Sequence, residues 1–145
     1  MKKLYLLLLC CAMAHLQAQP SANKGLSDLD EGQIIQQCIG FQPLVDKIPH
    51  DILTKITEYF ILNHGMDLNY SKGLEVNNKR ISLLTKGELS PTKPYFLFHT
   101  LSIKKDRAFV RYYFIYTNNG AETTIPITID FVRNNSEWQI LNHTI

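Results

Sequence analysis

The sequence predicts an α+β domain in which one or two N-terminal helices pack on a curved four-stranded antiparallel meander. Two observations predict this class. Apolar residues recur every three or four positions in the first half of the chain, which is typical of amphipathic helices. Roughly the last fifty residues instead alternate between apolar and polar positions in runs joined by tight turns, which is typical of strands. Because one face of that sheet is apolar, the helices must cover it.

Residues 1–18 are expected to be a signal peptide that is removed on export. Lys2 and Lys3 give it a positive start, residues 4–14 are almost entirely apolar, and Ala18 is a small residue suited to cleavage. The two-lysine start resembles bacterial export signals. We therefore expect a periplasmic or extracellular protein.

The position of the cut has an alternative, after Ala14 instead of Ala18, and either cut removes Cys10 and Cys11. A lipid-anchored form would need a small residue before the acylated cysteine. Leu9 precedes Cys10, so the sequence favours release without a lipid anchor.

The remaining chain is expected to be a disordered lead-in at 19–26 followed by one α+β domain at 27–145. Loss of Lys2 and Lys3 from the fifteen Lys and Arg residues leaves thirteen, which equals the thirteen Asp and Glu residues. A domain with no net charge is a poor candidate for binding nucleic acid or an anionic membrane surface. Later apolar runs are too short to span a membrane.

Cysteine usage also limits the chemistry of the exported chain. Cys38 would be its only cysteine, so no intramolecular disulfide is expected in an oxidising compartment. Ile34 and Ile35 lie at helical spacing from it, which indicates a buried side chain rather than a reactive thiol.

Two helices are expected before the sheet. The first begins at Ser27, with acidic residues in its first turn, and ends at Gly40. The second begins near Pro49 and extends through apolar positions to Leu62, where Asn63-His64-Gly65 supplies a stop.

The middle of the chain, from 66 to 94, has a weaker pattern. Apolar residues on either side of Asn77-Asn78 suggest a short hairpin. Residues 90–94 contain two prolines and are expected to form a loop.

The four C-terminal runs are expected to be strands at 95–104, 107–117, 122–133 and 137–143. Their turns are Lys105-Asp106, Asn119-Gly120 and the polar Asn134-Asn135-Ser136, of which Asn-Gly is the strongest hairpin signal. Counting from two-residue turns places apolar residues opposite one another, which supports the register. The expected pairs are Leu97 with Phe114, Leu101 with Val110, Phe114 with Ile125, and Val110 with Ile129. Pro126 cannot donate to a ladder, so we expect pairing to stop or a bulge to form there.

The register predicts an inner face that the helices cover. Its residues are Tyr95, Leu97, His99, Leu101, Ile103, Ala108, Val110, Tyr112, Phe114, Tyr116, Ile125, Ile127, Ile129, Phe131, Trp138 and Ile140. With helices first and a meander after them, the chain resembles the cystatin-like and nuclear-transport-factor-like cone. The resemblance covers residues 28–143 in element order and no specific motif. It implies a helix lying in a bent sheet, and relatives of that fold commonly bind or process small molecules in the cone.

One polar row on the inner face is a candidate ligand site. His99, Tyr112 and Asn142 are expected at one level across the sheet, and Tyr95 and Tyr116 are expected to face each other one step further toward the open end. Polar groups that converge on an apolar concavity are typical of a small-molecule or peptide pocket. The alternative is that these side chains belong to the core and reach backbone groups or water.

Catalysis, cofactors and metals are not expected. No Asp or Glu points inward from the four strands to tune the His99 imidazole, so a small lyase or isomerase is the less favoured reading. His50, His64, His99 and His143 lack the spacing of metal ligands. The preferred function is a non-catalytic binding module.

The outer face of the sheet supports a competing function. Phe96, Phe98, Tyr113 and Ile115 point away from the expected core, and a contiguous aromatic patch usually contacts something. The candidates are the segment 66–89, a second copy of the chain or another protein. The resemblance implies self-association through this face, because that is typical of nuclear-transport-factor-like proteins.

Overall fold

The computed structural model describes residues 23–66, 68 and 73–145, with side chains described from Asp28 onward. The expected signal peptide, both of its cleavage sites and residues 19–22 lie outside the described residues. Residues 23–26, expected in the lead-in, belong to the first helix.

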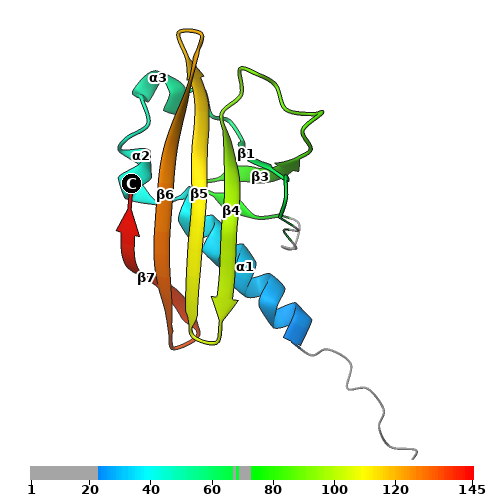
Figure 1. The fold of residues 1–145 in the computed structure, drawn as a ribbon, viewed down its shortest axis with the longest axis vertical. Helices are drawn as coiled ribbons and strands as arrows, with labels where there is room; N and C mark the ends of the chain where they lie inside the picture. The colour runs from blue at the N-terminus through cyan, green and yellow to red at the C-terminus, as the bar shows by residue number, and fades with distance from the viewer. Residues whose placement is uncertain (1–22, 67, 69–72) are drawn as a thin grey trace, which may run out of the picture.

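The described chain forms short helices and one sheet. The helices are α1 (Asn23–Ile39), α2 (Gln42–Val45) and α3 (His50–Leu53). The strands are β1 (Tyr59–Leu62), β2 (Glu75–Val76), β3 (Lys79–Leu84), β4 (Tyr95–Lys104), β5 (Arg107–Asn118), β6 (Ala121–Asn134) and β7 (Glu137–Thr144). The sheet order is β2-β3-β1-β4-β5-β6-β7 (Figure 1). The α+β class is confirmed, but the expected sheet of four antiparallel strands is wrong. Residues 59–84 add strands β1, β2 and β3, and the parallel pairing of β1 makes the sheet mixed.

Strand β1 occupies the end of the segment that was expected to be a second helix. Helix α3 covers only the first turn after Pro49. The run Tyr59–Leu62 is apolar throughout, which suits a strand with neighbours on both sides. A run of this length is too short for its periodicity to distinguish a strand from a helix. Strand β1 pairs in parallel with β3, Tyr59 opposite Ile81, and with β4, Ile61 opposite Phe96.

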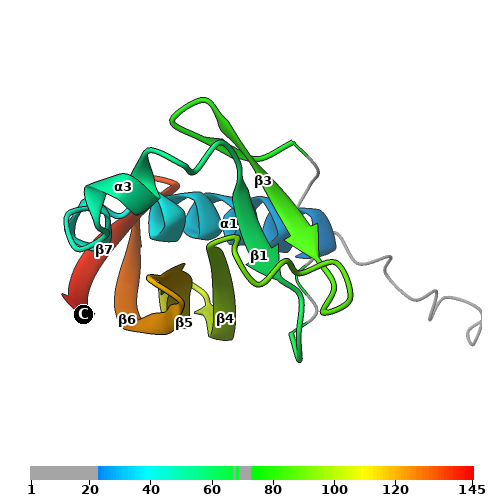
Figure 2. The same cartoon turned by 90° about the horizontal axis from the view of Figure 1, so that it is seen from above.

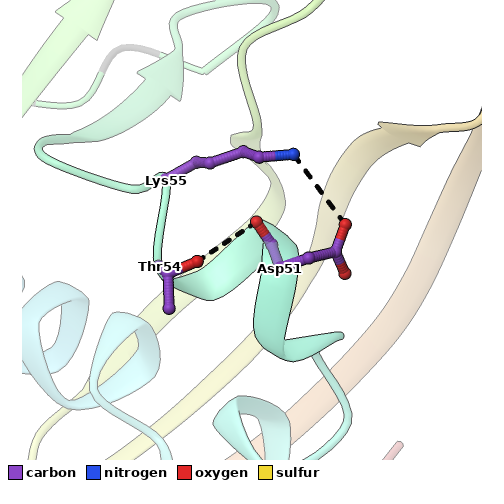
Figure 3. Close-up of polar contacts among 3 residues, drawn as sticks. All are labelled: Asp51, Thr54 and Lys55. Atoms are coloured by element: carbon purple, nitrogen blue, oxygen red, sulfur yellow. Dashed lines mark hydrogen bonds and ion pairs between the residues drawn. The ribbon is translucent and has the colours of Figure 1, made fainter.

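Burial of one apolar side chain, rather than its surface polar contacts, holds helix α3 in place. Ile52 is buried in the core. At the protein surface, the Lys55 ammonium lies 3.9 Å from the Asp51 carboxylate, and the Thr54 hydroxyl donates to the Asp51 carbonyl at 3.3 Å (Figure 3). Both members of the ion pair are mostly exposed, so the pair adds little to the free energy of unfolding.

The hairpin expected around Asn77-Asn78 is confirmed. Strands β2 and β3 pair antiparallel, with Val76 opposite Lys79. Asn77 and Asn78 have φ angles of 52° and 61°, as a two-residue primed turn requires. Asn tolerates this left-handed region better than most residues because its side chain can bond to the nearby backbone.

Strands β4 to β7 form the expected meander, and each bound lies within one residue of its expected position. The expected pairs Leu101–Val110, Phe114–Ile125 and Val110–Ile129 are confirmed. Asn119 and Gly120 have positive φ angles of 50° and 80°, so the Asn-Gly turn has the geometry that its sequence indicates.

A β-bulge in β4 changes the register of its first four residues. Phe98 lies opposite Tyr112 and Thr100 opposite Arg111, so His99 is an extra residue without a partner on β5. Because side chains alternate along a strand, one extra residue exchanges the faces of every residue before it. The expected pair of Leu97 with Phe114 is therefore wrong. Phe96 pairs with Phe114, and Leu97 pairs with Tyr113.

The β6–β7 hairpin also departs from the expected register. Of the three polar residues expected in its turn, Asn134 is paired with Glu137, so the turn consists of Asn135 and Ser136. A second bulge leaves Leu141 without a partner on β6. Asn142 consequently lies opposite Asp130, whereas Tyr112 pairs with Ile127, so the two are not at one level as expected.

Pro126 is accommodated without a bulge of its own. It pairs with Tyr113 in a continuous β5–β6 register. The β6–β7 ladder extends only from Asn134 to Thr128, so Pro126 has no partner on that side. The expectation that pairing stops next to this proline is confirmed, because a residue without an N–H fits an open edge.

The sheet curls into a half-barrel around helix α1, which lies along its concave side (Figure 2). The largest fully buried side chains include Phe96, Phe98, Tyr112, Phe114 and Phe131. The Tyr112 hydroxyl donates to the Cys38 carbonyl at 2.7 Å. This bond satisfies one of the carbonyls that the C-terminal turn of a helix leaves without an intrahelical partner.

Polar contacts fix the other side of α1 to strand β7. The Gln37 amide donates to the Trp138 carbonyl at 2.7 Å, and the Trp138 indole donates to the Asp30 carboxylate at 3.2 Å. The same carboxylate forms an ion pair with Arg133, whose guanidinium lies 4.6 Å from the centre of the Trp138 ring. Together these contacts join α1 to strands β6 and β7.

The Tyr112 hydroxyl should make stability sensitive to alkaline pH. Burial, with a smaller contribution from Cys38, holds the pKa of this phenol well above its ordinary value of 10.0. The unfolded chain therefore ionises first, so the free energy of unfolding falls as pH rises above about 10. Tyr112→Phe should cost about 1 kcal/mol at pH 7 by removing the bond to Cys38. The same variant should also show a smaller decrease in the free energy of unfolding between pH 9 and pH 11 than the wild type.

Urea titrations at several pH values measure both effects. Tyr113→Phe, which changes a phenol on the outer face, is the matched control and should keep the alkaline loss of the wild type. An alkaline loss that is the same in Tyr112→Phe and in the wild type would show that another group causes it.

Candidate functional site

The polar row expected on the inner face is not assembled. His99 is the bulge residue of β4 and is exposed; its Nδ1 lies 2.9 Å from the Thr100 hydroxyl, and its ring packs edge-on against Tyr113. Tyr112 lies in the core. Asn142 is exposed near the end of β7, where its side-chain oxygen accepts a bond from the His143 N–H. The three residues occupy three different environments.

The two further tyrosines expected in the pocket are also separated. Tyr95 pairs with Ile115 on the outer side, and burial together with nearby Glu122 raises the pKa of its phenol. Tyr116 is buried and stacks on Phe114, with ring centres 5.7 Å apart. The expectation that Tyr95 faces Tyr116 is therefore wrong, and its physical cause is again the bulge at His99.

Aromatic side chains fill the space next to α1 where the ligand was expected. The rings of Phe96 and Phe114 lie 4.9 Å apart, and those of Phe98 and Tyr112 stack at 5.1 Å. The Tyr112 hydroxyl, which was expected to face a ligand, is used by the Cys38 carbonyl. This part of the concave side serves as the hydrophobic core.

The residues expected at a partner interface divide between the two faces. Phe96 and Phe98 are 1% and 2% exposed and belong to the core, so their expected outward orientation is wrong. Ile115 is on the outer side but only 7% exposed. Tyr113 is half-buried on the outer side. Leu97 and Tyr95, expected inside, take the outward positions that Phe96 and Phe98 give up.

The register places five apolar residues next to one another on the outer face. Leu97, Tyr113 and Pro126 form one row across β4, β5 and β6, and Tyr95 and Ile115 belong to the next row. We call this set of five the outer band. Pro126 is exposed, and Tyr95, Leu97 and Tyr113 are half-buried. The outer band is thus a contiguous apolar surface that lies outside the core.

Two loops border the outer band without covering it fully. His64, Gly65 and Met66 line a hollow together with Leu97 and His99. On the other side, the Thr117 hydroxyl donates to the Pro91 carbonyl at 2.9 Å. Pro126, at the other end of its row, is exposed.

Sequence reasoning missed Leu97 and Pro126 as surface residues of one patch. Tyr95 to Phe98 are all apolar, so this run does not show which alternate set faces inward. For Pro126 a signal did exist. A proline has no N–H to donate, so it favours a position with a paired strand on one side only, as Pro126 has beside β5.

The described residues show neither a metal site nor a membrane-spanning helix. In the described ranges, no three His, Cys, Asp or Glu side chains come together in a way that could hold a metal ion. None of the helices in that same part of the chain is both long and apolar enough to cross a membrane.

Comparison with protein-family models, with curated proteins and with solved structures found no match for this chain. Its function must therefore be inferred from its own surface.

Proposed function

We propose that the chain is an exported, non-catalytic binding module that associates with a second copy of itself through the outer band. The single observation that carries this function is the cross-strand row of Leu97, Tyr113 and Pro126 on the outer face. The resemblance to nuclear-transport-factor-like proteins implies the same mode of association. Export is proposed from the N-terminal sequence alone.

The shape and composition of the outer band suit a self-complementary interface. Its members lie on regular, paired positions of three central strands, so its backbone is rigid. Interfaces are enriched in aromatic residues and depleted in charges at their centre, and the outer band contains two tyrosines and no charged residue. A two-fold contact would place this patch against its own copy.

A small-molecule pocket in the cone is the weaker candidate. His99, Tyr112 and Asn142 lie apart, and core aromatic side chains occupy the space in which they were expected to meet.

Sedimentation velocity over a concentration series tests self-association. The wild-type mature protein should form a dimer as its concentration rises through the micromolar range. Pro126→Glu should weaken the dimer at least tenfold, because the new carboxylate would be buried without a partner at the interface. Pro126 is exposed in the monomer, so this change should leave the fold intact.

Gln139→Glu is the matched control, because it adds the same charge at an exposed β7 position outside the outer band. It should dimerise like the wild type. A wild-type chain that stays monomeric at millimolar concentration would rule out self-association. Equal weakening by both variants would rule out the outer band as its site.

A further inference from the structure

A second feature of the outer face lies below the outer band, at the end where the β4–β5 turn is drawn in Figure 1. It is a hollow of about 450 Å³, within the size range of small-molecule sites. Strands β4 to β7 all contribute to it. Its lining includes Ser102, Lys104, Arg107, Phe109, Asp130 and Leu141.

Two cations face each other in this hollow. Lys104 and Arg107 are directly opposite in the β4–β5 ladder, and both are exposed. Like charges in this arrangement destabilise a strand pair. Among the described residues, neither cation forms an ion pair with a carboxylate. An anion bound between them would neutralise the repulsion that the strand pairing creates.

Apolar groups form the other part of the hollow. Phe109 is half-buried in its wall, and the Arg111 guanidinium lies 6.0 Å from the centre of the Phe109 ring. Leu141, the extra residue of the β7 bulge, is 57% exposed. A ligand that uses the whole hollow therefore needs an apolar body as well as a negative charge.

The remaining polar groups restrict the ligand further. Asp130 lies opposite Phe109 and lines the same hollow, so a second negative charge on the ligand would be repelled. An ionised Asp130 carboxylate accepts hydrogen bonds and cannot donate them. The matching group on a ligand is a hydroxyl or amino donor placed away from its carboxylate.

From this combination we infer that the hollow is a binding site for small aryl or alkyl monocarboxylates that carry a hydrogen-bond donor. Lys104 and Arg107 would bind the carboxylate, Phe109 and Leu141 the apolar body, and Asp130 the donor. The site is separate from the outer band and does not depend on self-association.

A pair of probes that differ only in charge tests this inference. The probes are 4-hydroxyphenylacetate and the uncharged 4-hydroxyphenylacetamide, titrated into the full mature protein at low salt and followed by NMR of its amide groups. The carboxylate should produce saturable shifts at Lys104, Arg107, Phe109 and Leu141. The amide should bind at least tenfold more weakly.

Lys104→Gln combined with Arg107→Gln should weaken carboxylate binding at least tenfold. Arg80→Gln combined with Lys86→Gln removes the same two charge types from exposed positions of the β3 region and should bind like the wild type. Loss of the opposed charges relieves repulsion, so the first variant should melt no lower than the wild type. This separates lost binding from lost folding.

Three outcomes would overturn the inference. The first is a linear, non-saturable response to the carboxylate. The second is equal affinity for the amide, and the third is equal weakening by the two double variants. Repeating the titration with Pro126→Glu distinguishes this site from the proposed self-association, because that variant should keep full affinity for the carboxylate.

Discussion

Phe98→Glu is expected to unfold the protein, whereas Leu97→Glu, one residue earlier, should leave it folded. Phe98 is 2% exposed and stacks on Tyr112 in the core, so the new carboxylate would be buried without a partner. Such a change costs more than about 4 kcal/mol, which is a large part of the stability of a domain of this size. Leu97 is half-buried on the outer face, where a carboxylate can reach water.

Circular dichroism during thermal unfolding measures this difference directly. Leu97→Glu should show a cooperative transition, and Phe98→Glu should show none. The opposite order, with Leu97→Glu unfolded and Phe98→Glu folded, would mean that β4 lacks the bulge at His99 and follows the register counted from its turn.

Phe114→Ala is expected to reduce the free energy of unfolding by about 3–5 kcal/mol. Phe114 is 1% exposed and contacts the rings of Phe96 and Tyr116. Removing its ring loses the burial of a large apolar group and leaves a cavity that rigid neighbours on paired strands cannot fill.

Phe109→Ala removes the same group from the same strand, on the outer face, and is the matched control. Its cost should be about 1 kcal/mol or less, because the Phe109 side chain is already partly in water. Urea unfolding at pH 7 compares the two variants. Equal costs would contradict the assignment of Phe114 to the core.

The C-terminal strands were predictable because their signals are local. Asn119-Gly120 fixes a two-residue turn, and the β5–β6 register follows from it by counting. Strand β1 was not predictable in the same way. Its four apolar residues fit a helix or a strand equally well, and its parallel neighbours are determined by distant parts of the chain.

The position of the expected ligand site was wrong for a different reason. A bulge adds one residue to one strand and leaves no clear mark in the sequence, yet it exchanges the two faces of everything before it. Between the apolar run 95–98 and Leu101 the chain has two polar residues, His99 and Thr100. A strand that turns the His99 side chain inward and one that turns it outward are therefore equally regular alternations of apolar and polar residues. The structure has the pattern that buries the two phenylalanine rings, Phe96 and Phe98, and leaves the Tyr95 hydroxyl outside the core.

The proposal that the outer band is the surface of self-association is tested most directly by the solvent exposure of individual side chains. NMR with a soluble gadolinium chelate measures this exposure at low and at high protein concentration. At low concentration, signals of Leu97, Tyr113 and Pro126 should be attenuated, while those of Phe98 and Ile129 should be protected. At high concentration, the first group should become protected too. Attenuation of Phe98 would contradict the filled cone, and persistent attenuation of Leu97, Tyr113 and Pro126 at high concentration would contradict association through the outer band.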